Sequence, residues 1–302
     1  MLLLGVACIA MMSGNMSVAK ERTWYKYENE HFVAFSNESE KTVVKLLTEL
    51  EYFRAAVLQF AKLEADKFAP KPNVIIFRTE KEFHKFIGSR DLGGIALNAH
   101  GAVYMITPAG SNSRYNEVIL RHEYTHLLVA RHNMQYPTWF NEGFAELMAA
   151  TTFRSKNTVF SVGDTYGRQR TETRLTPWSE IVSDEFKMHE VDDTGRRSDA
   201  YLQCWFLVHY FLLGNEGKNR NLLSQYFVRI GTGEDSLQAF EAVVGMSADE
   251  FGENVLTEYK MRYGLYDFRG PPIEPIFDKT VLSSEGFNIH VERFRGRYSL
   301  FN

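Results

Sequence analysis

The feature that most constrains this chain is the pentapeptide HEYTH at positions 122–126. It lies in the run Asn116 to Arg131 (NEVILRHEYTHLLVAR), which has no Gly or Pro and is apolar on both sides of the motif, so a buried helix is predicted. Residues four apart in an α-helix lie on one face, one turn apart. The imidazoles of His122 and His126 would therefore lie side by side, and a buried set of this kind needs a partner such as a metal ion to offset its desolvation.

Zinc is the metal that this spacing favours, because two imidazole nitrogens can bind one Zn²⁺ at about 2.0–2.1 Å each. Glu123 lies between the histidines, where its carboxylate can reach a metal-bound water as a general base. Catalytic zinc takes three protein ligands and leaves the fourth position to water. The stretch 137–146 (PTWFNEGFAE) offers Glu142 and Glu146 as candidates for the third ligand. Gly143 would allow the helix that carries them to approach the histidine helix closely.

HEYTH followed by WFNEGFAE resembles the gluzincin metallopeptidases, the group of thermolysin and the membrane alanyl aminopeptidases. It looks most like the compact bacterial peptidase-MA-like proteins. In that group the Asn-Glu-Gly run supplies the third zinc ligand, which implies Glu142, and an acid one turn later holds a zinc-binding histidine from behind, which implies Glu146. The resemblance is confined to residues 116–150. The 15 residues between His126 and Glu142 form a shorter connection than in the large aminopeptidases, so their substrate-binding features are not carried over.

An apolar helix is predicted over residues 199–213 (DAYLQCWFLVHYFLL). Related metallopeptidases place a Tyr or His from the later, helical half where it can donate a hydrogen bond to the oxyanion of the tetrahedral intermediate. Tyr201 is the first candidate for this donor and His209 is the second. The alternative for Tyr201 is a core tyrosine whose hydroxyl is satisfied by the protein.

Local patterns predict the other elements. A β-hairpin is expected at 24–36, a helix at 41–63, a buried strand at 73–78, a short helix at 80–87 and a strand at 102–106. In gluzincins the strand directly before the histidine helix is the sheet edge along which extended peptides bind. The alternative here is a plain structural strand.

The second half of the chain is predicted to be mostly helical. Thr138 is a candidate N-cap for the second helix, and further helices are expected at 220–231 and at 247–261, the latter with a Ser247/Glu250 capping box. Residues 153–193 are polar and irregular, with a short helix from about Thr176, and could line a cleft or form a lid. A terminal strand or an interaction tail is expected at 287–301.

Together these elements predict an α+β fold, a small thermolysin-like zincin domain with a mixed sheet, an active-site helix and a mostly helical lower half. The domain is expected to span residues 20–262. Its upper α/β half would be 20–134 and its helical half 135–262, followed by a C-terminal extension at 263–302.

The first 19 residues resemble a signal peptide. Residues 1–12 (MLLLGVACIAMM) are apolar and too short to span a bilayer, and Ser17-Val18-Ala19 matches a small-x-small cleavage site, which predicts export to the periplasm or the medium. The segment lacks Lys or Arg at its start, so an uncleaved interfacial segment or a buried first helix are alternatives. A lipoprotein anchor at Cys8 is disfavoured because Gly5 stands where that signal usually has Leu. Cys204 would then be the single remaining cysteine, a small buried hydrophobe.

The predicted function is zinc-dependent hydrolysis of peptide bonds by a metal-activated water, with a peptide or protein as substrate. The alternative is a zinc-stabilised, catalytically weak peptide-binding or scaffold protein of the cell envelope. The net charge of −4 and the lack of a Lys/Arg block argue against a nucleic-acid partner, and no later run is long and apolar enough to insert stably in a membrane.

Overall fold

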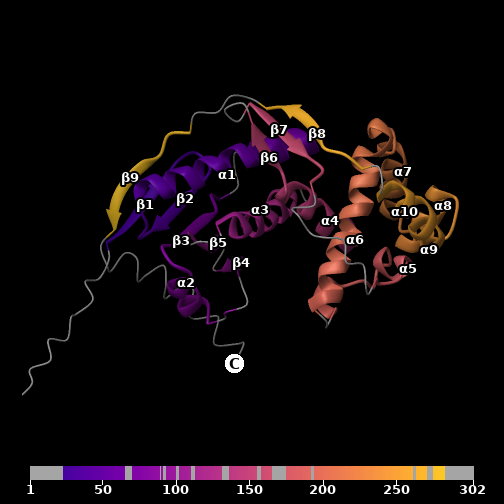
Figure 1. Cartoon of the computed structure of the whole chain (residues 1–302), viewed down its shortest axis with the longest axis horizontal. Coiled ribbons are helices and arrows are strands. Elements are labelled where there is room, and N and C mark those ends of the chain that lie inside the picture. Colours follow the sequence, from indigo (N-terminus) through magenta and orange to yellow (C-terminus); the bar gives the residue numbers. More distant parts are fainter. Residues whose placement is uncertain are drawn as a thin grey trace, which may run out of the picture.

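A computed structural model of the chain describes residues 23–64, 70–88, 90, 93–99, 102–109, 113–130, 136–154, 158–164, 175–191, 194–260, 263–270 and 275–282. This part is an α+β structure, as predicted, with a six-stranded mixed sheet, a sheet of three strands and a group of helices beside them (Figure 1). None of the helices within the described ranges is long and apolar enough to cross a lipid bilayer.

The main sheet has the strand order β4-β5-β3-β2-β1-β9. Strands β5, β3 and β2 are parallel to one another, and each outer strand runs antiparallel to its neighbour. The predicted hairpin and the predicted buried strand are both present. The strands are β1 (Trp24–Glu28), β2 (Val33–Ser36), β3 (Asn73–Phe77), β4 (Ile95–Ala99), β5 (Ala102–Pro108) and β9 (Asp278–Leu282).

The strand before the histidine helix is not an edge strand, so the expectation that it forms the substrate-binding edge of the sheet is wrong. Residues 102–106 belong to β5, which pairs with β3 on one side and with β4 on the other. The edge position belongs to β4, residues 95–99, which folds back antiparallel onto β5. The sequence does not predict β4, because its short run lies between Gly94 and Gly101, which indicate turns.

Helices cover both faces of the sheet. α1 (Glu40–Ala61) and α3 (Ser113–Ala130) pack on one face, and α2 (Glu80–Ile87) packs on the other. Successive side chains of a strand point to opposite faces, so Ile76 of β3 joins the larger core under α1 and α3, whereas Ile75 joins the smaller core under α2. α3 is the predicted histidine helix and begins three residues earlier than expected.

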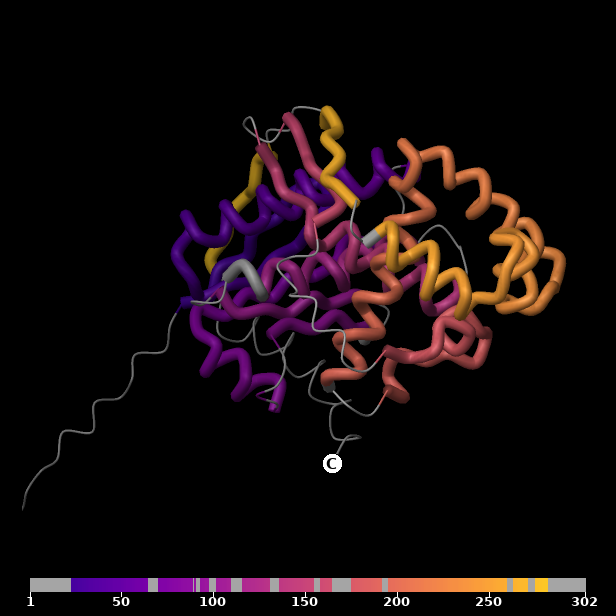
Figure 2. The backbone as a smooth tube through the Cα atoms, turned by 45° about the vertical axis from the view of Figure 1, so that its right-hand side comes forward, coloured from indigo at the N-terminus to yellow at the C-terminus, as the bar shows by residue number. Residues whose placement is uncertain are grey.

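The later half is helical, as predicted, and α6 packs against the helix of residues 138–149 on the side of the sheet, with the later helices on its other side (Figures 1 and 2). The Ser247/Glu250 capping box is present, whereas α8 is not predicted by the sequence. Thr138 is not an N-cap: it is the first helical residue, and Pro137 precedes it without a side-chain cap. The helices are α4 (Thr138–Ala149), α5 (Trp178–Ile181), α6 (Thr194–Leu213), α7 (Arg220–Gly231), α8 (Ser236–Val244), α9 (Ala248–Glu250), a π-helix (Phe251–Leu256) and α10 (Thr257–Lys260), with 3₁₀ turns at Met188–Glu190 and Gly214–Gly217.

Part of the stretch predicted to be irregular forms a second sheet. β6 (Thr152–Arg154) and β7 (Val159–Val162) form a hairpin, and β8 (Tyr266–Arg269) pairs with β7. β6 and β7 have only three and four residues, which is too short for an alternating pattern to distinguish a strand from a loop.

The segment expected as a C-terminal extension contributes strands to both sheets, since β8 completes the second sheet and β9 pairs with β1 of the main sheet (Figure 1). Both strands also contact α1. Gln59 Nε2 donates to the carbonyl of Arg269 at 2.6 Å, and Lys279 Nζ is 2.7 Å from Glu40 Oε2. The predictions for the signal peptide, Cys8 and residues 287–301 lie outside the described residues.

Candidate metal centre

Three helices meet at the candidate site. α3 carries His122 and His126, α4 carries Glu142 and Glu146, and α6 carries Tyr201. α3 is oriented by its apolar positions Leu120, Tyr124 and Leu128, which are 2%, 0% and 3% exposed in the larger core. The two histidines therefore emerge on the side of α3 that faces α4.

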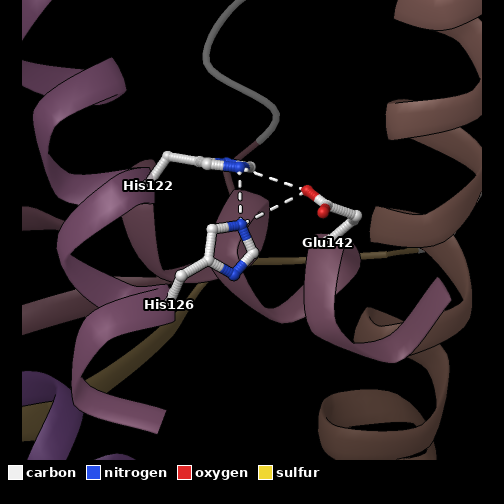
Figure 3. Close-up of side chains that lie close together, drawn as sticks. All are labelled: His122, His126 and Glu142. Carbon is white, nitrogen blue, oxygen red and sulfur yellow. Dashed lines mark hydrogen bonds and ion pairs between the residues drawn. The ribbon is translucent and has the colours of Figure 1, made fainter. Parts of the chain in front are cut away.

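The histidine and glutamate donor atoms converge on one point (Figure 3). His126 Nε2 lies 3.0 Å from His122 Nε2, and Glu142 Oε2 lies 3.3 Å from each of these nitrogens. A tetrahedral zinc ion with ligands at about 2.0–2.1 Å would separate its ligand atoms by about 3.3 Å. The triangle of donor atoms therefore has the size that a single zinc ion requires.

The electrostatics of the three side chains also suit a cation. Burial disfavours a charged imidazole, but hydrogen bonds to Glu142 and Glu146 outweigh it and raise the pKa of His122 to about 10. Burial likewise disfavours the charged Glu142, yet hydrogen bonds from His122 and His126 lower its pKa to about 2. Two carboxylates thus hold positive charge at this place, and a zinc ion bound there would replace the proton.

Glu146 lies behind His122, on the side away from the donor triangle. Its Oε1 is 3.1 Å from His122 Nδ1, and its side chain is 13% exposed. Once Nε2 gives up its proton, the nearby Glu146 carboxylate favours the tautomer with the N–H at Nδ1, and the lone pair freed on Nε2 points at Glu142 and His126. Of the two acids that the sequence leaves open, the structure brings Glu142 to the donor triangle and Glu146 to the outer ring nitrogen.

Tyr201 reaches the same site from α6. Its ring centroid is 5.7 Å from that of His122, at an angle of 81°. Burial, followed by the negative charges of Glu142, Glu146 and Glu123, raises the pKa of Tyr201 well above its usual value of 10.0. The phenol therefore keeps its proton at neutral pH and can donate a hydrogen bond at the centre.

His209, the second candidate for an oxyanion donor, lies elsewhere. Its Nδ1 is 2.5 Å from the Tyr259 hydroxyl and its Nε2 is 3.2 Å from the Gly264 carbonyl oxygen. Its ring packs against Trp205 at a centroid distance of 4.6 Å. His209 lies eight residues after Tyr201 on α6, where that helix contacts the C-terminal segment. The hypothesis that His209 is the oxyanion donor is therefore wrong.

Glu123 lies on α3 between the two histidines and is partly exposed. No described side chain makes a hydrogen bond or ion pair with it. Its negative charge is one of the causes, after burial, Glu142 and Glu146, that raise the pKa of Tyr201.

Gly143 allows α4 to approach another helix closely, as predicted, but that helix is α6 and not the histidine helix α3. A Cβ atom there would lie 2.2 Å from the carbonyl oxygen of Cys204 on α6. α4 therefore packs directly on α6, and this contact brings Tyr201 beside the glutamates. Cys204 itself is fully buried and its pKa is raised by burial, in agreement with its predicted role as a small hydrophobe.

Arg121 makes contacts that its position in the sequence does not predict. Its Nη1 donates to the carbonyl of Thr151, just after α4, at 3.0 Å. Its guanidinium also lies 5.6 Å from the ring centroids of both Phe53 and Phe153. It thus links α3 to the end of α4. In the sequence, the only indication of this role is a single arginine between apolar residues and the HEYTH motif.

Comparison with known proteins agrees with this geometry. The family model Peptidase_M9, described as collagenase, matches residues 22–250, a span that includes all the residues of the candidate centre. Members of that family are zinc metallopeptidases. None of the curated proteins compared with the chain matches it. Because the family match covers most of the chain and its zinc dependence agrees with the His-His-Glu triangle, the chain belongs to the collagenase family of zinc metallopeptidases.

Proposed function

We propose that the chain hydrolyses peptide bonds outside the cytoplasm, with zinc held by His122, His126 and Glu142 and with Glu123 as the general base. The observation that carries this proposal is the donor triangle with edges of 3.0, 3.3 and 3.3 Å. The glutamate third donor, supplied by the helix that follows the histidine helix, supports a gluzincin-type centre. The resemblance to the peptidase-MA-like proteins rests on the same residues.

When bound, zinc would acidify a water molecule and polarise the scissile carbonyl. Glu123 would take the proton from the attacking water and pass it to the leaving amine. Tyr201 would donate its hydroxyl proton in a hydrogen bond to the developing oxyanion. Glu146 would keep the Nδ1 proton of His122 in place and so orient this ring. Since the nucleophile is water, no covalent intermediate with the enzyme is expected.

The peptide would bind along β4. In the described sheet no strand pairs with the outer edge of β4, so its backbone groups can accept an extended peptide as an added strand. This edge starts directly against the histidine helix, because a Cβ atom at Gly94 would lie 3.2 Å from the side chain of Ile119. The family resemblance gave residues 102–106 the role of binding an extended peptide. We assign this role to residues 95–99 instead, because they form the edge strand.

Export and domain organisation complete the proposal. Residues 1–19 would be removed as a signal peptide, and residues 20–262 would form the catalytic domain together with the strands that follow. The test is the N-terminal sequence of the protein recovered from the periplasm or medium of a producing cell, which should begin at Lys20. Recovery from the cytoplasm with Met1 retained would contradict this part of the proposal without affecting the metal centre.

The metal centre is tested by elemental mass spectrometry on residues 20–302, beside Glu142→Ala and Glu123→Gln. About one zinc per chain is expected in the parent and in Glu123→Gln, with zinc depleted in Glu142→Ala. A fluorogenic peptide library should then be cleaved by the parent and not by Glu123→Gln. Zinc at one per chain with no turnover would favour the peptide-binding or scaffold alternative. A chain that binds no zinc after reconstitution would contradict both.

A further inference from the structure

A second cavity lies behind α4, on the side away from the histidines. Glu142 and Glu146 point from α4 toward α3, whereas Phe140 and Phe144 lie on the opposite side of the same helix and line this cavity. Its volume is about 460 Å³, within the range of pockets that hold small organic ligands. None of the candidate zinc ligands lines it, so it is separate from the metal centre.

The floor of this cavity is apolar. It is formed by five buried side chains from four helices, with no ionisable group among them, so the floor suits a hydrocarbon chain. The rim is different, because the two exposed members of the lining are Lys62 and Ser224. The floor residues are Phe60, Val129, Phe140, Phe144 and Leu223.

The charged residues of the lining are both cations. Lys62 follows the end of α1, Arg220 begins α7, and the lining contains no carboxylate. Arg220 is partly buried, its Nε donates to the carbonyl of Leu212 at 2.8 Å, and its guanidinium lies 5.5 Å from the ring centroid of Phe60. Within the described ranges, no carboxylate pairs with it and no acceptor is found for its two terminal nitrogens. A half-buried guanidinium in this state favours a ligand carboxylate, which can accept two parallel hydrogen bonds.

We infer that this cavity binds the anion of a medium-chain fatty acid. The alkyl chain lies over the aromatic floor, and the carboxylate lies at the rim beside Arg220 and Lys62. The inference rests on the shape, polarity and charge of the lining and does not depend on the metal centre or on peptide hydrolysis.

The first test uses the unmodified chain. Isothermal titration with octanoate, decanoate and dodecanoate, each below its micelle-forming concentration, should give saturable binding of one ligand per chain. The affinity should rise about fourfold for each added methylene until the cavity is full. The cation dodecyltrimethylammonium should bind at least roughly tenfold more weakly than dodecanoate, because its head group meets two positive charges. Equal affinity for the two head groups, or no saturable binding, would overturn the inference.

The second test locates the ligand. Ser224→Trp places a large ring at the rim and should abolish dodecanoate binding, whereas Gln225→Trp, at an exposed neighbouring position outside the lining, should leave it unchanged. Lys62→Gln should weaken binding severalfold and leave the chain-length dependence intact. Thermal unfolding and zinc content of each variant establish that the fold is retained. Unchanged dodecanoate binding in a folded Ser224→Trp protein would place the ligand elsewhere and so overturn the inference.

Discussion

At the scale of single residues, His122 decides how the metal-free centre responds to pH. The pKa of His122 is raised from 6.5 to about 10, so this group stabilises the metal-free fold fully below pH 6.5 and the stabilisation is lost as the pH rises through about 10. The pKa of Glu142 is lowered from 4.5 to about 2, so its contribution is full above pH 4.5 and is lost as the pH falls through about 2. Both contributions are complete between pH 4.5 and 6.5.

Zinc binding near pH 8 should release about one proton per chain. His122 is protonated at this pH in the metal-free protein, because its pKa is about 10, and zinc requires the free lone pair on Nε2. Calorimetric titration of the metal-free protein with zinc, in two buffers of different ionisation enthalpy, measures this number. Glu146→Gln, which removes one of the two carboxylates beside the imidazole, should release fewer protons. Equal heats in the two buffers for the parent chain would contradict this account of His122.

Tyr201→Phe should lower kcat about 10²- to 10³-fold and leave KM and zinc content nearly unchanged. The phenol donates to charge that develops only in the transition state, and the substitution removes only the hydroxyl. Tyr210→Phe is the control, since Tyr210 lies on the same helix and packs on Phe251, away from the metal centre. If kcat/KM of Tyr201→Phe equals that of the parent, the oxyanion donor must be another group.

At the scale of helices, Gly143→Ala should separate α4 from α6. The new Cβ atom would lie 2.2 Å from the Cys204 carbonyl oxygen, so one helix must move, at a cost of about 1–3 kcal/mol in the free energy of unfolding. The movement should also reduce peptidase activity, because Glu142 and Tyr201 lie on the two helices that separate. Urea denaturation and steady-state kinetics measure the two effects.

Gly231→Ala is the matched control for this substitution. Gly231 ends α7, and a Cβ atom there would meet nothing within 4 Å, so the change should be neutral or slightly stabilising. A Gly143→Ala protein as stable as Gly231→Ala would show that the close contact between α4 and α6 is not rigid.

The elements differ in how well the sequence predicts them. α1, α3 and α6 are long enough for the 3.6-residue apolar period to specify them, and the HEYTH spacing places both histidines on one face of α3. β4 and β6 are short strands whose existence depends on partners elsewhere in the chain, so local patterns miss them. The helix that Gly143 contacts is likewise determined by tertiary packing. A small residue indicates that another helix can approach closely, but it does not indicate which helix.

The candidate site was predictable for a similar reason. His122, His126, Glu142 and Glu146 lie on two successive helices, so spacing alone limits where they can meet. Tyr201 comes from a helix more than 50 residues later, and only the resemblance to metallopeptidases pointed to it. The contacts of Arg121 and the position of His209 depend on how distant segments pack, which no local pattern records.

At the scale of the whole molecule, the segment after residue 262 is predicted to be part of the folded domain. A chain ending at 263 lacks β8 and β9, leaves β1 and β7 without these neighbours, and loses the Gly264 carbonyl that contacts His209. Its midpoint of thermal unfolding should fall by several degrees at least. A chain ending at 270 keeps β8 and should lose less. If the two truncated chains and the full chain unfold at the same temperature, residues 263–282 do not contribute to the stability of the domain.

The pairing of β9 with β1 also has a consequence for the order of events during synthesis. Tyr25 pairs with Val281, so one of the first described residues and one of the last lie side by side in the finished sheet. On the ribosome, the helices that carry the histidines and glutamates are complete long before the strand that closes the sheet has been translated. The nascent polypeptide therefore passes through a long interval in which β1 is an open edge. Among the described strands β9 is the last to be translated, so until then the unpaired edge of β1 is open to a chaperone.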